Sequence, residues 1–172
     1  MRVRRALISL VLVVTAGLSG CGDDDGSDET GSDEPSSDTA GSGDTRNACE
    51  VLTAAEVTEA VGAPVKEGVR SSGPASTGGR FSSCVWQSDD PASPADSATL
   101  TIYPNTAAAD SAREDGSQDV PGIGDGAFTA AFSSIWVYVG EESFFAQRYT
   151  VDDSEGNGAL AEALAEAAAA SF

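Results

Sequence analysis

The stretch from Ser134 to Val151, SIWVYVGEESFFAQRYTV, is the clearest β-hairpin pattern in the chain. Two runs rich in β-branched and aromatic residues flank a short polar segment, which is typical of two antiparallel strands joined by a tight turn. A turn at residues 141 and 142 would place Val139 opposite Phe144 across the ladder. The hairpin therefore predicts an antiparallel sheet.

The two faces of this hairpin differ in chemistry, because successive side chains of a strand point to opposite faces. One face is apolar and carries Ile135, Val137, Val139, Phe144 and Ala146. The other face is aromatic with polar edges and carries Trp136, Tyr138, Phe145, Gln147 and Tyr149. If this face is uncovered, its rings form a platform for stacking on a sugar or an apolar partner, with Arg148 nearby as a rare positive group. If a helix covers it, the rings are simply core.

Helical patterns lie on both sides of the hairpin. In the segment CEVLTAAEVTEAVGAPV, Thr53 and Glu56 form a capping box, and Gly62 ends the helix. A weaker helix is expected from 107 to 114. The chain closes with GALAEALAEAAAASF, an alanine-rich helix with a stripe of Leu160, Leu164 and Phe172.

Three further strands are expected upstream of the hairpin, at residues 65–69, 81–87 and 98–103. Clusters of Gly, Ser, Pro and Asp separate them, as turns require. Residues 48–172 therefore predict a single α+β domain, in which an antiparallel sheet is flanked by three helices.

The N-terminus has the layout of an export signal. Three arginines precede a short apolar run, which is too short for a spanning helix and is followed by acids rather than by a basic flank. The run ends in Leu18-Ser19-Gly20-Cys21. This tetrapeptide resembles the lipobox of bacterial lipoproteins at all four positions.

The lipobox resemblance implies that residues 1–20 are a signal peptide and that the Cys21 sulfur carries a diacylglyceryl group. Two acyl chains are enough for stable anchoring. We therefore expect the protein on the outer face of the cytoplasmic membrane, facing the cell wall, with this covalent anchor and no other cofactor. The alternative is an ordinary secretory signal with a chance cysteine.

The cysteine count agrees with this interpretation. Three cysteines in an exported chain leave one unpaired unless it is otherwise occupied. With Cys21 assigned to lipid, Cys49 and Cys84 are expected to form a disulfide in an oxidising exterior. The rival interpretation is a metal site or a catalytic thiol pair. Either would need nearby histidines or further cysteines, and the chain has no histidine.

Acidic residues dominate the rest of the chain. Residues 22–47 hold nine acids and one base without a large apolar residue, so residues 21–47 are expected to be a lipidated cysteine followed by a disordered tether. Residues 48–172 hold 19 acids and five bases, and the whole chain carries a net charge of −19. This charge argues against nucleic acid and anionic lipid surfaces as partners, and it favours a soluble monomer and cationic partners.

The order of motifs in the folded part resembles one family. The motifs are, in order, Cys49-x-x-Leu-Thr-x-x-Glu-Val with Gly62-Ala-Pro-Val, then Ser83-Cys84-Val85-Trp86, then Val120-Pro-Gly-Ile-Gly-Asp125 and a strand pair. This order is similar to that of actinobacterial lipoproteins grouped as domain of unknown function 3558. The resemblance covers nearly all of the folded part. It implies an exported, cysteine-paired α+β domain, and it implies no particular activity.

Catalytic chemistry has little support in the sequence. Without histidine, a Ser-His-Asp or Cys-His site is excluded, and a Ser-Lys pair would have to use Lys66, the only lysine. A glycosidase built from two carboxylates stays open, because four acids lie close in sequence: Asp119, Asp125, Glu141 and Glu142. In so acidic a chain such neighbours are also expected by chance. We assign no catalytic residue.

Two further motifs are better explained by local structure than by ligands. In PGIGDGAF, the glycines 122, 124 and 126 fit a turn with positive φ, in which Asp125 bonds its own backbone, rather than a phosphate loop. DDSEGNG matches the first half of a calcium loop at Asp153, Glu155, Asn157 and Gly158. Leu164 stands where the bidentate glutamate should be, so Asn157 is expected to be a helix cap instead. No metal site is predicted.

The sequence thus favours a non-catalytic binding or accessory lipoprotein of the cell envelope. Its partner would be a wall component, a small molecule or a neighbouring envelope protein. A carboxylate-based envelope hydrolase and a passive structural surface protein are the alternatives.

Overall fold

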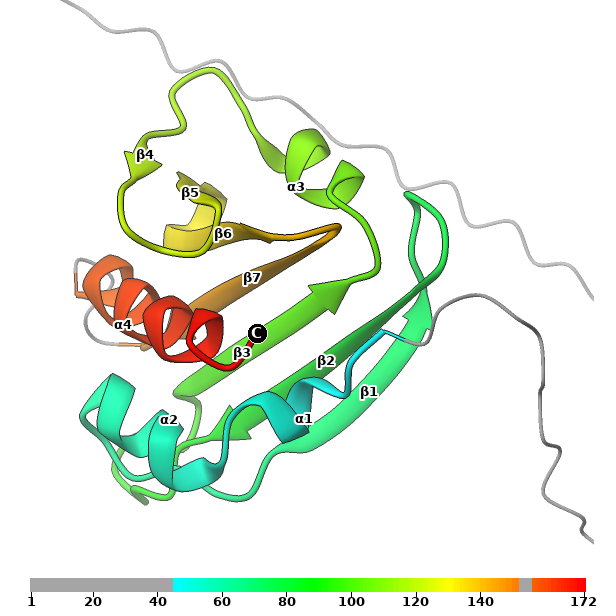
Figure 1. Cartoon of the computed structure of the whole chain (residues 1–172). Coiled ribbons are helices and arrows are strands. Elements are labelled where there is room, and N and C mark those ends of the chain that lie inside the picture. The colour runs from blue at the N-terminus through cyan, green and yellow to red at the C-terminus, as the bar shows by residue number, and fades with distance from the viewer. Residues whose placement is uncertain (1–44, 152–155) are drawn as a thin grey trace, which may run out of the picture. The chain divides into compact units, whose positions relative to one another are not determined.

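The computed structural model describes residues 45–151 and 156–172 (Figure 1). These residues form one seven-stranded antiparallel sheet in the order β1-β2-β3-β7-β6-β5-β4. The predicted α+β class is confirmed. The strands are β1 (Val69–Pro74), β2 (Arg80–Gln87), β3 (Ser97–Tyr103), β4 (Asp119–Val120), β5 (Gly126–Ala130), β6 (Ser134–Val139) and β7 (Glu142–Tyr149).

Four α-helices accompany the sheet, one more than predicted: α1 (Ala48–Val51), α2 (Ala54–Val61), α3 (Ala107–Ala112) and α4 (Asn157–Ala169). The extra helix, α1, arises because the backbone of Thr53 is extended and begins a new helix. The Thr53–Glu56 capping box and the left-handed C-cap at Gly62 are both present in α2, as predicted. Among the described residues, no helix has the length and apolar character needed to cross a membrane.

Several predictions fall outside the described residues. They are the signal peptide, the lipobox from Leu18 to Cys21, most of the tether, and the Asp153 and Glu155 positions of the calcium motif.

The hairpin predicted from Ser134 to Val151 is present as β6 and β7, but its register differs from the prediction by two residues. Val139 pairs with Glu142 rather than Phe144, and Val137 pairs with Phe144. The loop is Gly140 and Glu141, because Gly140 supplies the positive φ of +59° that a two-residue hairpin loop requires. A shift of two leaves every side chain on its predicted face.

The strands predicted at 81–87 and 98–103 are confirmed as β2 and β3, whereas the strand at 65–69 is wrong. Val65 makes only an isolated bridge to Ser88, and the ladder resumes at the pair of Val69 with Val85. Between these two pairs, three residues on one side (66–68) oppose two on the other (86 and 87), so the chain bulges. Gly68 lies within this bulge, where an added Cβ would come 2.4 Å from the sulfur of Cys84.

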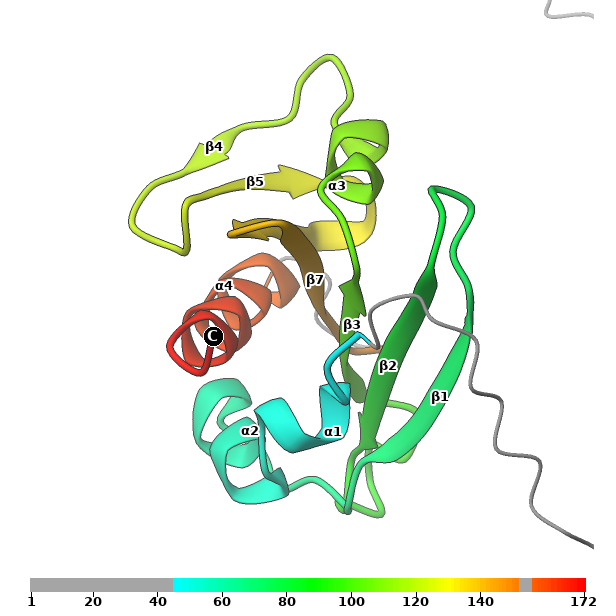
Figure 2. The ribbon, with the colours of Figure 1, turned by 45° about the vertical axis from the view of Figure 1, so that its right-hand side comes forward.

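The core lies between the sheet and the helices α1, α2 and α4, which cover the same face of the sheet (Figure 2). Most of the residues that β3, β6 and β7 turn toward these helices are buried, and Leu100, Ile102, Val137 and Phe144 are fully so. Helix α4 meets the sheet mainly through small side chains, namely Ala161, Ala165 and Ala168 around Leu164. The predicted stripe is therefore only partly right: Leu160 is half-buried, and Phe172 stacks on Phe144 at 5.1 Å.

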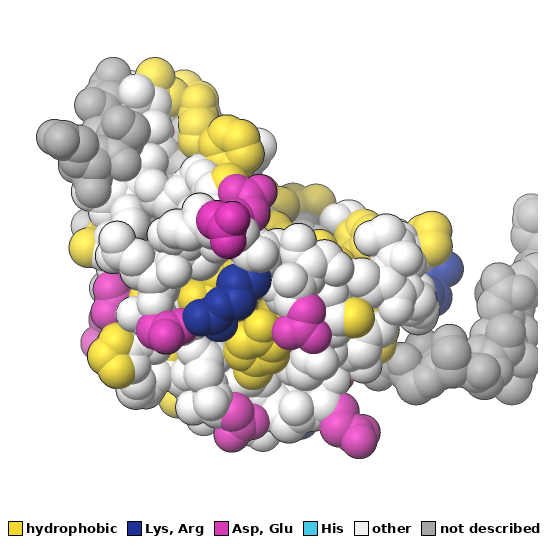
Figure 3. Space-filling model, turned by 90° about the horizontal axis from the view of Figure 1, so that it is seen from above, with side chains coloured by type: hydrophobic (Ala, Val, Ile, Leu, Met, Phe, Trp, Pro, Cys, Tyr) yellow, Lys and Arg dark blue, Asp and Glu magenta, His cyan; other side chains and the backbone are white. Residues whose placement is uncertain are grey.

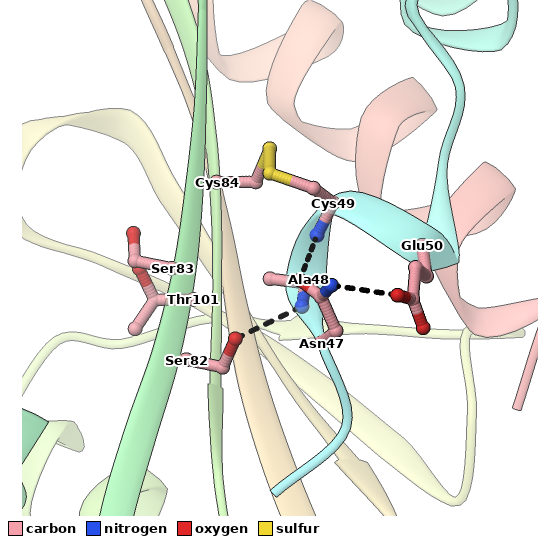
Figure 4. Close-up of a disulfide and its surroundings, with 8 residues drawn as sticks. All are labelled: Asn47, Ala48, Cys49, Glu50, Ser82, Ser83, Cys84 and Thr101. Atoms are coloured by element: carbon pink, nitrogen blue, oxygen red, sulfur yellow. Dashed lines mark hydrogen bonds between the residues drawn. A yellow bond between two sulfur atoms is a disulfide. The ribbon is translucent and has the colours of Figure 1, made fainter. Parts of the chain in front are cut away.

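The predicted disulfide between Cys49 and Cys84 is present and joins α1 to β2 (Figure 4). Hydrogen bonds hold the chain on the N-terminal side of the bridge. The Asn47 side chain accepts from the Cys49 amide at 3.2 Å, and the Ala48 amide donates to Ser82 Oγ at 3.0 Å. The first helix is therefore fixed to the sheet by both covalent and polar contacts.

Candidate functional site

The second face of the sheet is only partly covered. The short helix α3 lies on this side, over one end of the sheet (Figures 1 and 2). It is held there by a hydrogen bond from the Tyr138 hydroxyl to Asp110 Oδ1, at 3.0 Å. Just after α3, the Arg113 guanidinium lies 4.8 Å from the centre of the Phe128 ring. The remainder of this face has no helix over it among the described residues.

A continuous row of rings crosses this open face from β2 to β6. The ring centres of Phe81 and Tyr103 are 6.2 Å apart, those of Tyr103 and Trp136 are 5.5 Å apart, and those of Trp136 and Phe145 are 5.3 Å apart. Tyr103 pairs with Ser143, and this small buried residue leaves room for the Tyr103 ring to reach Trp136. Burial raises the pKa of the Tyr103 hydroxyl, which stays protonated.

One end of this row lines a shallow hollow of about 260 Å³, which we call the aromatic cleft. Trp136, Phe145 and Gln147 form its floor on the sheet. Ala112 and Glu114 form one side, and the 3₁₀ turn η1 (Ala131–Ser133) with Phe132 forms the other. Among the residues that the structure describes, Glu114 is the only charged one that lines the cleft.

Phe132 is the most unusual residue of the cleft. Its side chain is 86% exposed, and its backbone is left-handed with φ of 58° and ψ of 34°. Ser133 also has a positive φ, 55°. A bulky residue is strained in this region, and such strain persists where the surroundings impose it. Here the Gln147 side-chain amide donates to the Phe132 carbonyl at 3.1 Å, so a cleft residue holds the strained turn in place.

The structure brings together only some of the residues that the sequence singled out. Trp136 and Phe145 line the cleft. Tyr138 lies on the same face but turns toward α3, where burial and the bond to Asp110 raise the pKa of its hydroxyl. Tyr149 is 53% exposed and does not line the cleft.

The expectation that Arg148 accompanies these rings is wrong. Arg148 shares the helix-covered face with Ala146 and Phe144, because alternate residues of β7 share a face. It is 3% exposed and pairs with Asp96 at 3.4 Å. Burial lowers the pKa of the guanidinium, and the Asp96 charge opposes this effect.

The sequence offered no clear signal for Phe132, because the segment AAFSS reads as a turn of small residues with one ring. The residue becomes a candidate only through its exposure and backbone, both of which depend on how β5 and β6 are joined.

Three of the four acids considered for catalysis have a polar partner within the domain. Asp119 is paired with Arg113, Glu142 with Arg46 at 3.3 Å, and Asp125 Oδ2 accepts from the Gly140 amide at 2.6 Å. Asp125, Glu141 and Glu142 nevertheless line a common hollow of about 450 Å³, together with Arg46 and Phe172. In the described part of the chain, no group of three or more Asp, Glu, Cys or His side chains could hold a metal ion.

Three predicted local roles, those of Gly126, Asp125 and Asn157, need correction. Gly122 and Gly124 have the expected positive φ, +89° and +54°, but Gly126 is not among the positive-φ glycines. The Asp125 carboxylate caps the neighbouring hairpin loop at Gly140 rather than its own backbone. Asn157 is not the cap of α4 but its first residue, and its Oδ1 accepts from the Thr150 hydroxyl at 2.9 Å.

The surface at the α3 end of the molecule is acidic with few bases. Figure 3 shows this end from above. A group of basic side-chain atoms lies on hydrophobic side chains, and acidic side chains lie around it on several sides. This pattern opposes the binding of an anion near the cleft.

A scan against protein-family models, a search of curated proteins and a search of solved structures each returned no match. The resemblance to the lipoproteins of domain of unknown function 3558 stays a prediction that rests on the order of sequence motifs.

Proposed function

We propose that this protein is a lipoprotein of the cell envelope, anchored through a diacylglyceryl group on Cys21. Its folded domain binds a ligand in the aromatic cleft and does not catalyse a reaction. The anchor holds the protein at the outer face of the cytoplasmic membrane, and the tether carries the domain toward the cell wall.

The observation that carries the binding role is Phe132, an exposed ring on a strained backbone at the rim of an apolar hollow. Its ring gains almost nothing from burial in the unliganded domain, and its conformation costs about 1–2 kcal/mol. A bound ligand that packs against Phe132, Trp136 and Phe145 would supply the missing apolar contacts. A passive structural protein would have no need of this arrangement.

The shape and chemistry of the cleft favour one ring of a neutral ligand, such as a sugar of the cell wall. Pockets for drug-sized ligands measure roughly 300–1,000 Å³, and this cleft, at about 260 Å³, is smaller. Its aromatic floor suits the apolar face of a sugar ring, while the side chains of Gln147 and Glu114 offer polar groups to hydroxyls. The acidic surroundings disfavour an anionic ligand.

The anchor is tested by mass spectrometry of the native protein extracted from membranes. We expect residue 21 to be the first residue and to carry the lipid. The Cys21→Ser variant should appear in the culture medium or keep its signal peptide. A native product with residues 1–20 attached, or a soluble product without lipid, would overturn this part of the proposal.

The cleft is tested by the intrinsic fluorescence of the two tryptophans. Trp86 is 1% exposed in the core, so a ligand that changes the emission must act at Trp136. With soluble fragments of purified cell wall as the probe, we expect a saturable change in the emission of the parent. Because Trp136→Ala removes the reporting ring, binding by the variants is measured by calorimetric titration, in which Trp136→Ala should show no binding. Tyr149→Ala removes an exposed ring of the same face outside the cleft and should leave binding unchanged. Unaltered binding by Trp136→Ala would reject the cleft.

An envelope hydrolase is the second candidate, and the observation in its favour is the hollow lined by Asp125, Glu141 and Glu142. A hydrolase would shorten the same wall fragments, and Glu141→Gln or Glu142→Gln would stop it. We expect no change in fragment length with the unaltered protein.

A further inference from the structure

Strand β1 forms one edge of the sheet, with β2 on one side and no strand on the other among the described residues. It is six residues long, and five of these are exposed. The opposite edge is the two-residue strand β4. Long exposed edges present unpaired backbone groups to other chains, so β1 is the edge at which another chain could pair.

The hydrogen bonds around β2 show which backbone groups of β1 point outward. The Ser88 amide donates to the Asp96 carbonyl, so even-numbered residues of β2 bond to β3. Odd-numbered residues of β2 therefore bond to β1, as the bond from the Ala75 amide to the Gly79 carbonyl also indicates. Val69, Ser71 and Gly73 face β2 in this pattern, and Arg70, Ser72 and Pro74 face outward.

Pro74 supports this assignment, because proline lacks an amide hydrogen and is tolerated in a strand where that group would point away from the sheet. The outward amides and carbonyls of Arg70 and Ser72 remain for an incoming strand.

The charge of this edge is opposite to that of the rest of the domain. Residues 65–88, which contain β1 and β2, hold three bases (Lys66, Arg70 and Arg80) and one acid, Glu67. The other residues between 48 and 172 hold two bases and 18 acids. Arg113 and Arg148 are both ion-paired, whereas Lys66, Arg70 and Arg80 have no ion-pair partner among the described residues.

We propose that the outer edge of β1 binds an extended acidic segment of another protein, which adds to the sheet as a further strand. The alternating donors and acceptors of the edge match a peptide backbone, whereas an anionic polymer would use only the donors. A second copy of this domain is a poorer partner, because its own Lys66 and Arg70 would lie against the same positive charges and be repelled. This surface is at the β1 edge, whereas the aromatic cleft lies on β6 and β7.

The experiment measures binding of a synthetic capped peptide of alternating glutamate and valine to the mature protein, by fluorescence anisotropy of a dye on the peptide. Ser72→Pro removes one outward amide without touching the ladder to β2, and we expect the affinity to fall about tenfold. Ser72→Thr keeps the amide and should bind within about twofold of the parent.

Two peptide controls separate backbone pairing from charge. Replacing glutamate by lysine should abolish binding, and methylating alternate backbone amides of the acidic peptide should weaken it about tenfold or more. Equal binding of the methylated peptide, or no effect of Ser72→Pro, would overturn strand addition in favour of charge alone. Self-association in sedimentation that Ser72→Pro removes would instead show that a second copy occupies the edge, and it would also overturn the proposal.

A final control is a variant in which the acids of residues 22–44 are replaced by neutral residues, so that this segment cannot compete with the peptide for β1. If the peptide bound to this variant and not to the parent, the chain's own acidic segment would be the occupant of the edge, and the proposal of a separate partner would be wrong.

Discussion

The two faces of the sheet are made by alternate residues of the same strands, yet they differ in how deeply their side chains are buried. On the helix-covered face, Leu100, Ile102 and Phe144 are fully buried. On the other face, Trp136 and Phe145 remain partly exposed beside the aromatic cleft. Because neighbours in sequence belong to different faces, substitutions one residue apart should alter stability and the proposed ligand binding separately.

The largest expected effect concerns the bridge that attaches α1 to the covered face. Replacing both Cys49 and Cys84 by alanine should lower the free energy of unfolding by about 4 kcal/mol, since the bridge closes a loop with a sequence separation of 35. Urea denaturation of the two proteins measures the difference. Adding a reductant to the parent should reproduce it, and equal stability of the two proteins would mean that the bridge contributes nothing.

A matched pair on β3 compares the two faces directly. Leu100→Ala removes a fully buried side chain on the covered face and should cost about 3 kcal/mol. Thr99→Ala alters its half-buried neighbour on the open face and should cost about 0.5 kcal/mol or less. Thermal unfolding followed by circular dichroism tests both variants. Similar losses from the two would show that the open face is covered in solution.

Phe132→Gly should separate binding from stability. Relief of about 1–2 kcal/mol of left-handed strain offsets the extra entropy of glycine, roughly 0.5–1 kcal/mol. We therefore expect the midpoint of thermal unfolding to stay the same or rise, while binding of wall fragments is lost. Phe132→Tyr keeps the ring and should keep binding. A glycine variant that is clearly less stable would mean that the ring is packed in the native state.

The smallest expected effect is a pH dependence at the start of α2. Hydrogen bonds from the Thr53 amide and then from its hydroxyl lower the pKa of Glu56 below its usual 4.5, and desolvation opposes them. Because the folded pKa is the lower one, the stabilisation is present above pH 4.5 and is lost as the pH falls through the folded value. Glu56→Gln should be less stable than the parent near neutral pH, and the difference should shrink in acid. A difference independent of pH would exclude the carboxylate charge as its cause.

The sequence predicted the helices and strands that are marked by local residue patterns. It missed the features that are determined by contacts with residues far away in the chain. The capping box of α2, the strands β2 and β3, and the two faces of the β6–β7 hairpin follow from residue type and alternation. The start of β1 depended on the close approach of Gly68 to Cys84 and Trp86, which no local pattern reveals. The hairpin register was decided by a single glycine, Gly140.

The candidate site was half predictable for the same reason. Alternation placed Trp136 and Phe145 on one face, but the same rule should have placed Arg148 on the other face. Phe132 belongs to the cleft only because the turn after β5 holds it in a strained conformation, and the amide that fixes this turn comes from Gln147 on another strand.

The position of the disulfide also has a mechanical consequence. The described chain begins at residue 45, and Cys49 lies four residues further on, joined covalently to β2. β2 is bonded to a strand on each side. A pulling force applied through the N-terminal segment would therefore be transmitted to the sheet at Cys84 before it reached α2. The helices would then not detach from the sheet one after another under that force.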